Sequence, residues 1–121
     1  MKTVFLTIFL FLFGASYSQI SVFDDESSVI SYLEGKKFYN SDSGLEIEYG
    51  YISAYNTYGI KVVNKNGAKF NFINVEITPY GSFADLYGMS LDDGSSFGFR
   101  AYAKKLVVGA GQDGEQTFYL K

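Results

Sequence analysis

The stretch LEIEYGYI alternates strictly between apolar and polar positions. Every second residue from Leu45 to Tyr51 is apolar or aromatic, and Glu46, Glu48 and Gly50 lie between them. Such a period of two is typical of a strand that buries one face. The two tyrosines of this strand are therefore predicted to point inward and to pack in the core or at its rim.

A different period appears in residues 24–34. Val29, Ile30 and Leu33 recur at spacings of three and four, acidic residues open the segment, and Gly35 follows it. Carboxylates favour the N-terminal end of a helix, and glycine is the usual left-handed stop at its C-terminal end. The sequence predicts one short helix, which must pack against the rest of the chain because it is too short to be stable alone.

Strands and turns are predicted for the whole chain after Gly35. Turn-forming residues fill 40–44, Pro79 ends a long apolar stretch, and short apolar runs at 106–108 and 116–120 close the chain. The expected fold is mainly β (α+β): a helix followed by an antiparallel meander of about seven strands. Such a meander forms either a small barrel or a strongly curved sheet covered by the helix.

Polarity predicts the register of the first clear hairpin. A three-residue loop at 65–67 sets Val62 opposite Phe70 and Ile60 opposite Phe72, whereas a two-residue loop mixes apolar and polar partners. The three-residue loop also places a glycine at its left-handed position. We therefore expect the three-residue loop.

The same reasoning predicts a second hairpin from strands at 82–91 and 95–103. A three-residue loop at 92–94 sets Met89 opposite Phe97 and Tyr87 opposite Phe99, with serines and glycines on the other face. One face is then aromatic and the other nearly bare. A bare face allows a close approach by another segment, and the short helix or a ligand are the candidates.

The strand between these hairpins changes phase. Its apolar positions shift from even numbers to odd numbers between Phe72 and Ile73. We expect either a β-bulge near residues 71–74 or burial of this strand on both faces.

The N-terminus, MKTVFLTIFLFLFGASYSQ, has the layout of a secretory signal peptide. Lys2 precedes an apolar run, and small residues Ser16 and Ser18 stand before a cleavage point at Gln19. A membrane anchor would need about 20 apolar residues, and this run is shorter. We expect residues 1–18 to be removed and residues 19–121 to form a single exported domain, secreted, periplasmic or on the cell surface.

Composition narrows the possible functions. The chain has 10 basic and 13 acidic residues, a net charge of −3, and neither Cys nor His. This balance argues against nucleic acid and against an anionic membrane surface as partners. Without His or Cys the usual general base, the thiol nucleophile and nearly every zinc site are missing, so we expect no enzyme, no metal and no cofactor.

Tyrosines on predicted connections are the candidate binding residues. Tyr55, Asn56 and Tyr58 lie in the connection AYNTYG, and Tyr80 follows Pro79 in another. Rings on loops have less reason to be buried, so these residues are a candidate surface for a glycan or a protein partner. Ordinary packing is the alternative.

Two further hypotheses concern other residues. Glu46 and Glu48 lie roughly 7 Å apart along one strand face, a separation that suits a two-carboxylate glycan hydrolase, although a solvent-facing strand side is the preferred interpretation. The turn residues of 92–94 resemble a fragment of a calcium loop but lack its full set of ligands. Finally, a free edge at 116–120 would favour a structural subunit that assembles through its strand edges.

Overall fold

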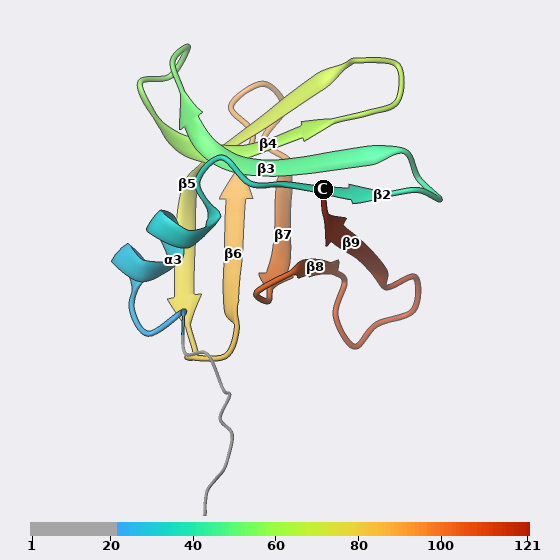
Figure 1. The fold of residues 1–121 in the computed structure, drawn as a ribbon. Coiled ribbons are helices and arrows are strands. Elements are labelled where there is room, and N and C mark those ends of the chain that lie inside the picture. Colours follow the sequence, from blue (N-terminus) through green and yellow to red (C-terminus); the bar gives the residue numbers. More distant parts are fainter. Residues whose placement is uncertain (1–21) are drawn as a thin grey trace, which may run out of the picture.

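The computed structural model describes residues 22–121, so the predicted signal peptide at 1–18 lies outside the described residues. One short helix precedes eight antiparallel strands that follow one another around a barrel (Figure 1). The elements are α3 (Glu26–Leu33), β2 (Lys37–Asn40), β3 (Leu45–Ile52), β4 (Thr57–Val63), β5 (Lys69–Pro79), β6 (Ala84–Met89), β7 (Ser96–Ala101), β8 (Lys105–Val108) and β9 (Gln116–Leu120). The predicted helix followed by an antiparallel meander is confirmed.

Pairing between the first and last strands closes the sheet into a barrel. Phe38 of β2 lies opposite Leu120 of β9, and Tyr39 lies opposite Tyr119. β9 also pairs with β8 from Gln116 to Tyr119. The strand predicted at 116–120 is therefore flanked on both sides, and the barrel is the correct one of the two predicted architectures.

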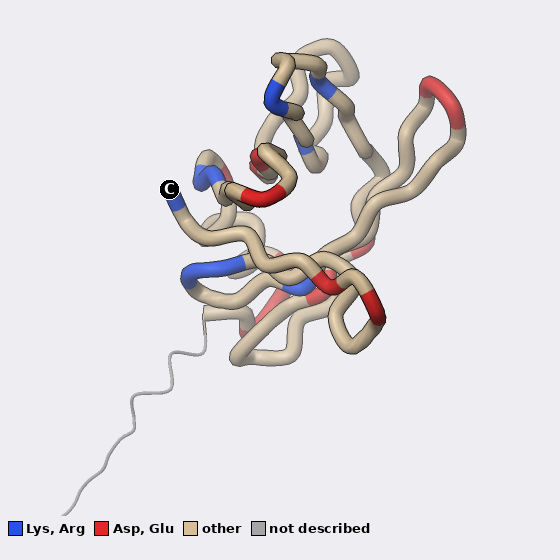
Figure 2. The backbone as a smooth tube through the Cα atoms, turned by 90° about the vertical axis from the view of Figure 1, so that its right-hand side faces the viewer, with Lys and Arg blue, Asp and Glu red and all other residues tan. Residues whose placement is uncertain are grey.

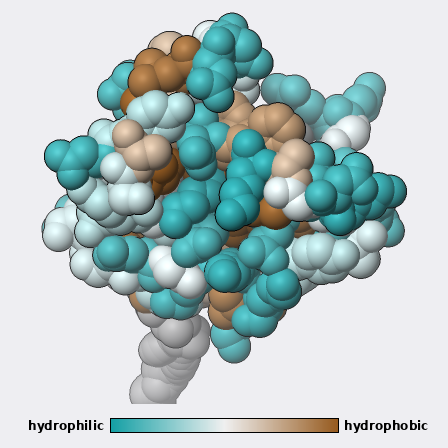
Figure 3. Space-filling model, turned by 90° about the horizontal axis from the view of Figure 1, so that it is seen from above, coloured by the Kyte–Doolittle hydropathy of each residue, from teal (hydrophilic) through white to brown (hydrophobic). Residues whose placement is uncertain are grey.

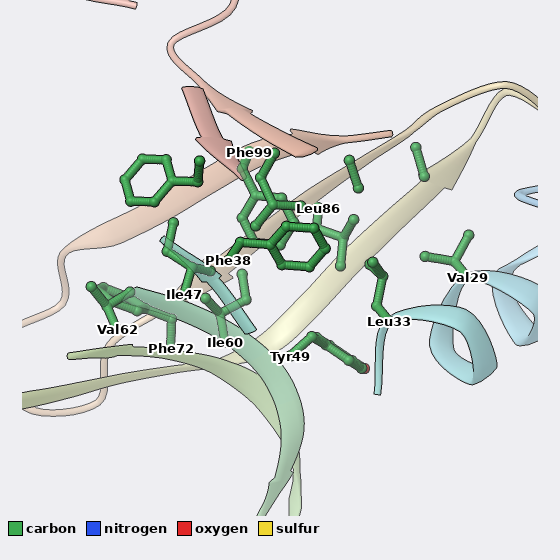
Figure 4. Close-up of a cluster of buried hydrophobic side chains, with 14 of the residues drawn as sticks. Val29, Leu33, Phe38, Ile47, Tyr49, Ile60, Val62, Phe72, Leu86 and Phe99 are labelled. Carbon is green, nitrogen blue, oxygen red and sulfur yellow. The ribbon is translucent and has the colours of Figure 1, made fainter. Parts of the chain in front are cut away.

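The core fills the barrel and extends under the helix. Side chains from α3 and from β2 to β7 converge on one interior, as Figure 4 shows. The largest side chains that are almost completely buried are Phe23, Phe38, Phe118, Leu33, Ile47, Ile60, Leu86, Leu106 and Val29. Because the chain has no disulfide, burial of this apolar surface is the main source of stability.

Helix α3 is capped at both ends as its sequence predicts. The Asp25 carboxylate accepts a hydrogen bond of 2.8 Å from the backbone N–H of Ser28. At the other end Gly35 has a φ of 82°, the left-handed conformation that stops a helix. Val29 and Leu33 are buried against the barrel.

Backbone bonds fix the helix to the barrel before its first turn and after its last. Phe23 and Gly81 exchange two backbone hydrogen bonds of 3.1 and 2.8 Å, and the N–H of Gly35 donates to the carbonyl of Tyr49 at 3.1 Å. The helix therefore lies beside β5 and β3 between these two anchor points (Figure 1).

The hairpin of β4 and β5 has the predicted register. Val62 lies opposite Phe70 and Ile60 opposite Phe72, and Gly67 in the loop has a φ of 86°. The phase change in β5 is also explained. The register with β6 shifts between Ile73 and Glu76, so the bulge is the correct alternative.

The predicted register of the β6–β7 hairpin is wrong by one residue. Leu86, not Tyr87, lies opposite Phe99, and Gly88, not Met89, lies opposite Phe97. The faces are therefore exchanged: Leu86 and Phe99 point into the core, and Tyr87 and Met89 are 52% and 45% exposed.

Hydrogen bonds within a four-residue loop account for this register. The N–H of Ser90 donates to the carbonyl of Ser95, which leaves residues 91–94 as the loop. The Ser90 hydroxyl accepts from the N–H of Asp92, and the Asp93 carboxylate accepts from the N–H of Ser95. These side chains satisfy the backbone of a loop that is one residue longer than predicted.

Neighbouring strands cover the glycines that the sequence placed on a bare face. Atoms of the Tyr87 ring lie 2.9 Å from the position that a Cβ on Gly98 would occupy, and Phe72 and Val75 lie over Gly88. Helix α3 packs instead on β3 and β5. Residues of the chain's own strands, and not the helix, fill this space.

Candidate functional site

Two glycines mark the point at which the β3–β4 hairpin leaves the barrel wall. Gly50 lies opposite Gly59, and a Cβ on Gly59 would lie only 2.6 Å from the carbonyl oxygen of Phe72 and 2.7 Å from the Ile52 side chain. The missing side chain lets the hairpin cross close to β5. Beyond this crossing the hairpin projects at the top of Figure 1.

Three tyrosine rings form a cluster at this crossing. The rings of Tyr49 and Tyr58 have centroids 5.9 Å apart, and Tyr51 meets Tyr58 edge to face at 5.6 Å. Exposure increases outward along β3, since Tyr49 is 5% exposed and Tyr51 is 47% exposed. The cluster therefore joins the core to the surface.

Hydrogen bonds fix the orientation of the outer two rings. The Tyr51 hydroxyl donates to Oδ1 of Asn56, and the Tyr58 hydroxyl donates to Oε2 of Glu34 at 3.1 Å. Asn56 has a φ of 54°, which asparagine tolerates better than most residues and which turns the chain at the hairpin tip. We call Glu34, Tyr51, Tyr55, Asn56 and Tyr58 the β3–β4 site.

Negative charge and burial shape the titration of this cluster. Burial, followed by the charge of Glu26, raises the pKa of Tyr49 to about 12. The hydrogen bond to Glu34, together with the charge of that carboxylate, raises the pKa of Tyr58. Tyr49 and Tyr58 therefore keep their protons at neutral pH, and the Tyr58 hydroxyl can donate its bond to Glu34.

The structure brings together three of the four predicted site residues. Tyr55 and Asn56 lie in the β3–β4 turn, and Tyr58 is adjacent to them. The predicted position of Tyr58 in a connection is wrong, because it belongs to strand β4 and its ring packs on Tyr49.

Sequence reasoning missed two members of the site. The sequence predicts that Tyr51 packs in the core or at its rim, and its ring is 47% exposed and contacts Tyr58 edge to face. Glu34 was treated only as the last residue of the helix, whereas it reaches Tyr58 across the fold. The available signal in the sequence is the presence of Gly50 and Gly59, because glycines within predicted strands often mark a close approach of another backbone.

Tyr80 belongs to a separate aromatic cluster. Its ring stacks on Phe83 at 4.8 Å, and the Arg100 guanidinium lies 4.4 Å from the centre of the Phe83 ring. Tyr80 follows the end of β5, roughly 20 Å along that strand from the level of Tyr58 at about 3.3 Å per residue. In Figure 1 the two regions lie at the top and the bottom of the barrel, so Tyr80 does not share the β3–β4 site.

Lysines surround the two candidate hydrolase carboxylates. Glu46 forms an ion pair of 2.7 Å with Lys121, and both Glu46 and Glu48 line a groove of about 320 Å³. The other residues of this groove are Lys37, Lys61, Val63, Lys69 and Asn71. A two-carboxylate glycosidase needs its two carboxyl groups in different surroundings, whereas Glu46 and Glu48 share this one groove.

Among residues 22–121, neither a charged patch nor a set of metal ligands provides a second candidate site. Lysine, arginine and acidic residues are scattered around the backbone in Figure 2, without one face of a single sign. No three potential metal-binding side chains among residues 22–121 lie close enough together to hold an ion. The turn residues of 92–94 bond to their own loop instead.

The projecting end of the barrel is accessible. Viewed from above, hydrophobic side chains emerge between hydrophilic ones (Figure 3).

Within residues 22–121 there is no helix with the length and apolar character needed to cross a membrane. Comparisons with protein-family models, curated proteins and solved structures gave no match.

Proposed function

We propose that this protein is an exported, non-enzymatic binding module that contacts a glycan through the β3–β4 site. The observation that carries this proposal is the pair of rings of Tyr51 and Tyr58, oriented by hydrogen bonds to Asn56 and Glu34 at an accessible end of the barrel. Export is inferred from the signal peptide predicted at 1–18.

The chemistry of the site matches that of a sugar ring. A sugar has apolar C–H faces, which pack on aromatic rings, and a rim of hydroxyl groups that donate and accept hydrogen bonds. Tyr51 supplies an exposed ring, while the Asn56 amide and the Glu34 carboxylate supply polar atoms beside it. Rings held in place lose little conformational entropy on binding.

The choice of binding over catalysis rests on the side chains available. The chain contains no His and no Cys, and the acidic pair at Glu46 and Glu48 lies among lysines. His is the commonest general acid–base residue and Cys the most nucleophilic side chain, so the residues most often used for catalysis are missing.

A glycan array tests the proposal. The mature protein from Gln19 is compared with Tyr51→Ala, which removes a ring that is 47% exposed, and with Tyr119→Ala, which removes a ring of β9 that is 62% exposed. We expect Tyr51→Ala to weaken glycan binding at least about tenfold, the loss of roughly 1.4 kcal/mol, and Tyr119→Ala to leave it unchanged. Thermal unfolding of both variants checks that the fold is intact.

Absence of binding to any glycan on the array would contradict the proposal. Equal weakening by both variants would place the contact elsewhere. Capture of a single protein from the native envelope, with no glycan signal, would replace the glycan with a protein partner at this surface.

A further inference from the structure

Strand β7 has a free edge on the side that faces β8. The two strands pair only at Arg100 with Val107 and at Ala101 with Leu106. Within residues 22–121, the first four residues of β7, Ser96 to Phe99, have no strand partner on that side. β7 therefore pairs with β8 only at its C-terminal end, and its first four residues have a free edge.

The direction of the backbone groups follows from the bonds at the two ends of β7. Ser95 accepts a bond from Ser90 on the β6 side, and Tyr102 donates to Lys105 on the β8 side at 2.8 Å. In an antiparallel ladder these directions alternate from one residue to the next. The N–H and C=O groups of Ser96 and Gly98 therefore point to the free edge.

A pocket and an exposed loop lie beside this edge. Gly98 lines a shallow pocket of about 280 Å³ together with Arg100, Val107, Gly109 and Ala110. The loop that begins at Gly109 is exposed and rich in glycine, so it carries few side chains that could cover the edge. An unpaired and accessible edge of this kind binds another strand.

We propose that a second copy of this chain pairs with the free edge of β7 in an antiparallel, two-fold symmetric arrangement. Phe97 lies at the symmetry axis, so that Ser96 of each copy is opposite Gly98 of the other. Each of these residue pairs exchanges N–H and C=O bonds, which satisfies the groups left free in the single chain.

Charge at the two ends of the edge favours a second copy as the partner. Asp92 and Asp93 precede β7, and Lys104 and Lys105 follow it, while Arg100 is already paired with Asp85 of the same chain. The two acidic residues and the two lysines are exposed. Antiparallel pairing sets the acidic end of one copy beside the basic end of the other at both ends of the interface, so the edge is complementary to itself.

Sedimentation velocity over a concentration series tests this dimer. Because the free edge is short, association is expected to be weak, and the series extends to about 1 mM protein. Ser96→Pro removes an edge N–H without removing a bond to β6, since Ser96 points away from β6. Ser96→Ala keeps that N–H and loses only the bond that the Ser96 hydroxyl accepts from Tyr87.

We expect the wild type and Ser96→Ala to dimerise, and Ser96→Pro to raise the dissociation constant at least about tenfold. A protein that remains monomeric throughout the series overturns the proposal. A dimer that Ser96→Pro does not weaken belongs to another surface and overturns it equally.

Amide hydrogen exchange on the wild type avoids any effect of proline on folding. The Gly98 amide should exchange more slowly as protein concentration rises, while exposed amides of the 109–114 loop should not change. Exchange of Gly98 that is independent of concentration contradicts self-pairing. Protection that appears only when a foreign peptide is added would assign the edge to a different partner.

Discussion

Tyr49 shows how one side chain links the core to the candidate site. Its ring is 5% exposed and packs on Tyr58, and its hydroxyl lies near the negative charges of Glu26 and Glu34. Burial and those charges both disfavour the phenolate. Tyr49 therefore keeps its proton in the folded state at a pH where a tyrosine in the unfolded chain loses it.

This difference predicts a loss of stability at alkaline pH. The pKa of Tyr49 is about 12 in the folded protein and about 10 in the unfolded chain. The contribution of Tyr49 is fully present below pH 10 and is lost as the pH rises from about 10 to 12, because the unfolded state releases the proton first. Urea unfolding at a series of pH values measures this decline.

Tyr49→Phe and Tyr119→Phe form the matched pair for this experiment. The free energy of unfolding of Tyr49→Phe should fall less steeply between pH 10 and 12 than that of the wild type, and Tyr119→Phe should follow the wild type. Identical slopes for the wild type and Tyr49→Phe would show that this hydroxyl does not couple to folding.

At the scale of the element, the β3–β4 hairpin depends on one glycine more than on its partner. A Cβ on Gly59 would lie 2.6 Å from backbone and 2.7 Å from Ile52, whereas one on Gly50 meets the Glu48 and Lys61 side chains at an ordinary 3.6 Å. The close approach to β5 therefore requires glycine at 59 only.

Alanine substitutions at these two positions test that difference. Gly59→Ala should lower the free energy of unfolding by about 1–3 kcal/mol, the usual cost of overpacking, and Gly50→Ala by less than about 1 kcal/mol. Chemical denaturation of both variants gives the comparison. Equal losses would contradict the close crossing of the hairpin over β5.

The two hairpins explain how far register can be predicted from sequence. In β4 and β5 only one register separates Ile60, Val62 and their phenylalanine partners from the lysines, so polarity is sufficient. In β6 and β7, tyrosines, glycines and serines alternate in a way that allows an apolar face in either register. The side-chain bonds of Ser90 and Asp93 within the loop decide it, and such bonds are not visible in an apolar–polar pattern.

The candidate site was only partly predictable for a related reason. The alternation of apolar and polar residues correctly gives the face of β3 on which Tyr49 and Tyr51 lie. It does not show where along that face the barrel ends. Glu34 and Tyr58 are 24 positions apart, and their contact depends on how the helix lies against the barrel. The sequence therefore identified the AYNTYG turn but not its neighbours.

At the scale of the whole molecule, β9 closes both the barrel and its core. Phe118 is 1% exposed inside the barrel, and its neighbour Tyr119 is 62% exposed outside. Alternating residues of one strand thus have opposite environments.

Phe118→Ala should lower the free energy of unfolding by about 3–5 kcal/mol through lost burial and the cavity that remains. Tyr119→Ala, on the same strand, should change it by less than about 1 kcal/mol. Chemical denaturation measures both. A small effect of Phe118→Ala would indicate that β9 is not part of the cooperative fold.

The most direct test of the binding proposal is an NMR titration of the mature protein with the oligosaccharide that binds most strongly on the array. We predict that the largest shifts fall on the amides of residues 51–58 and of Glu34, with no comparable change along β9. Shifts centred on the lysine-lined groove, on the Tyr80 cluster or on β9 would contradict the assignment of glycan binding to the β3–β4 site.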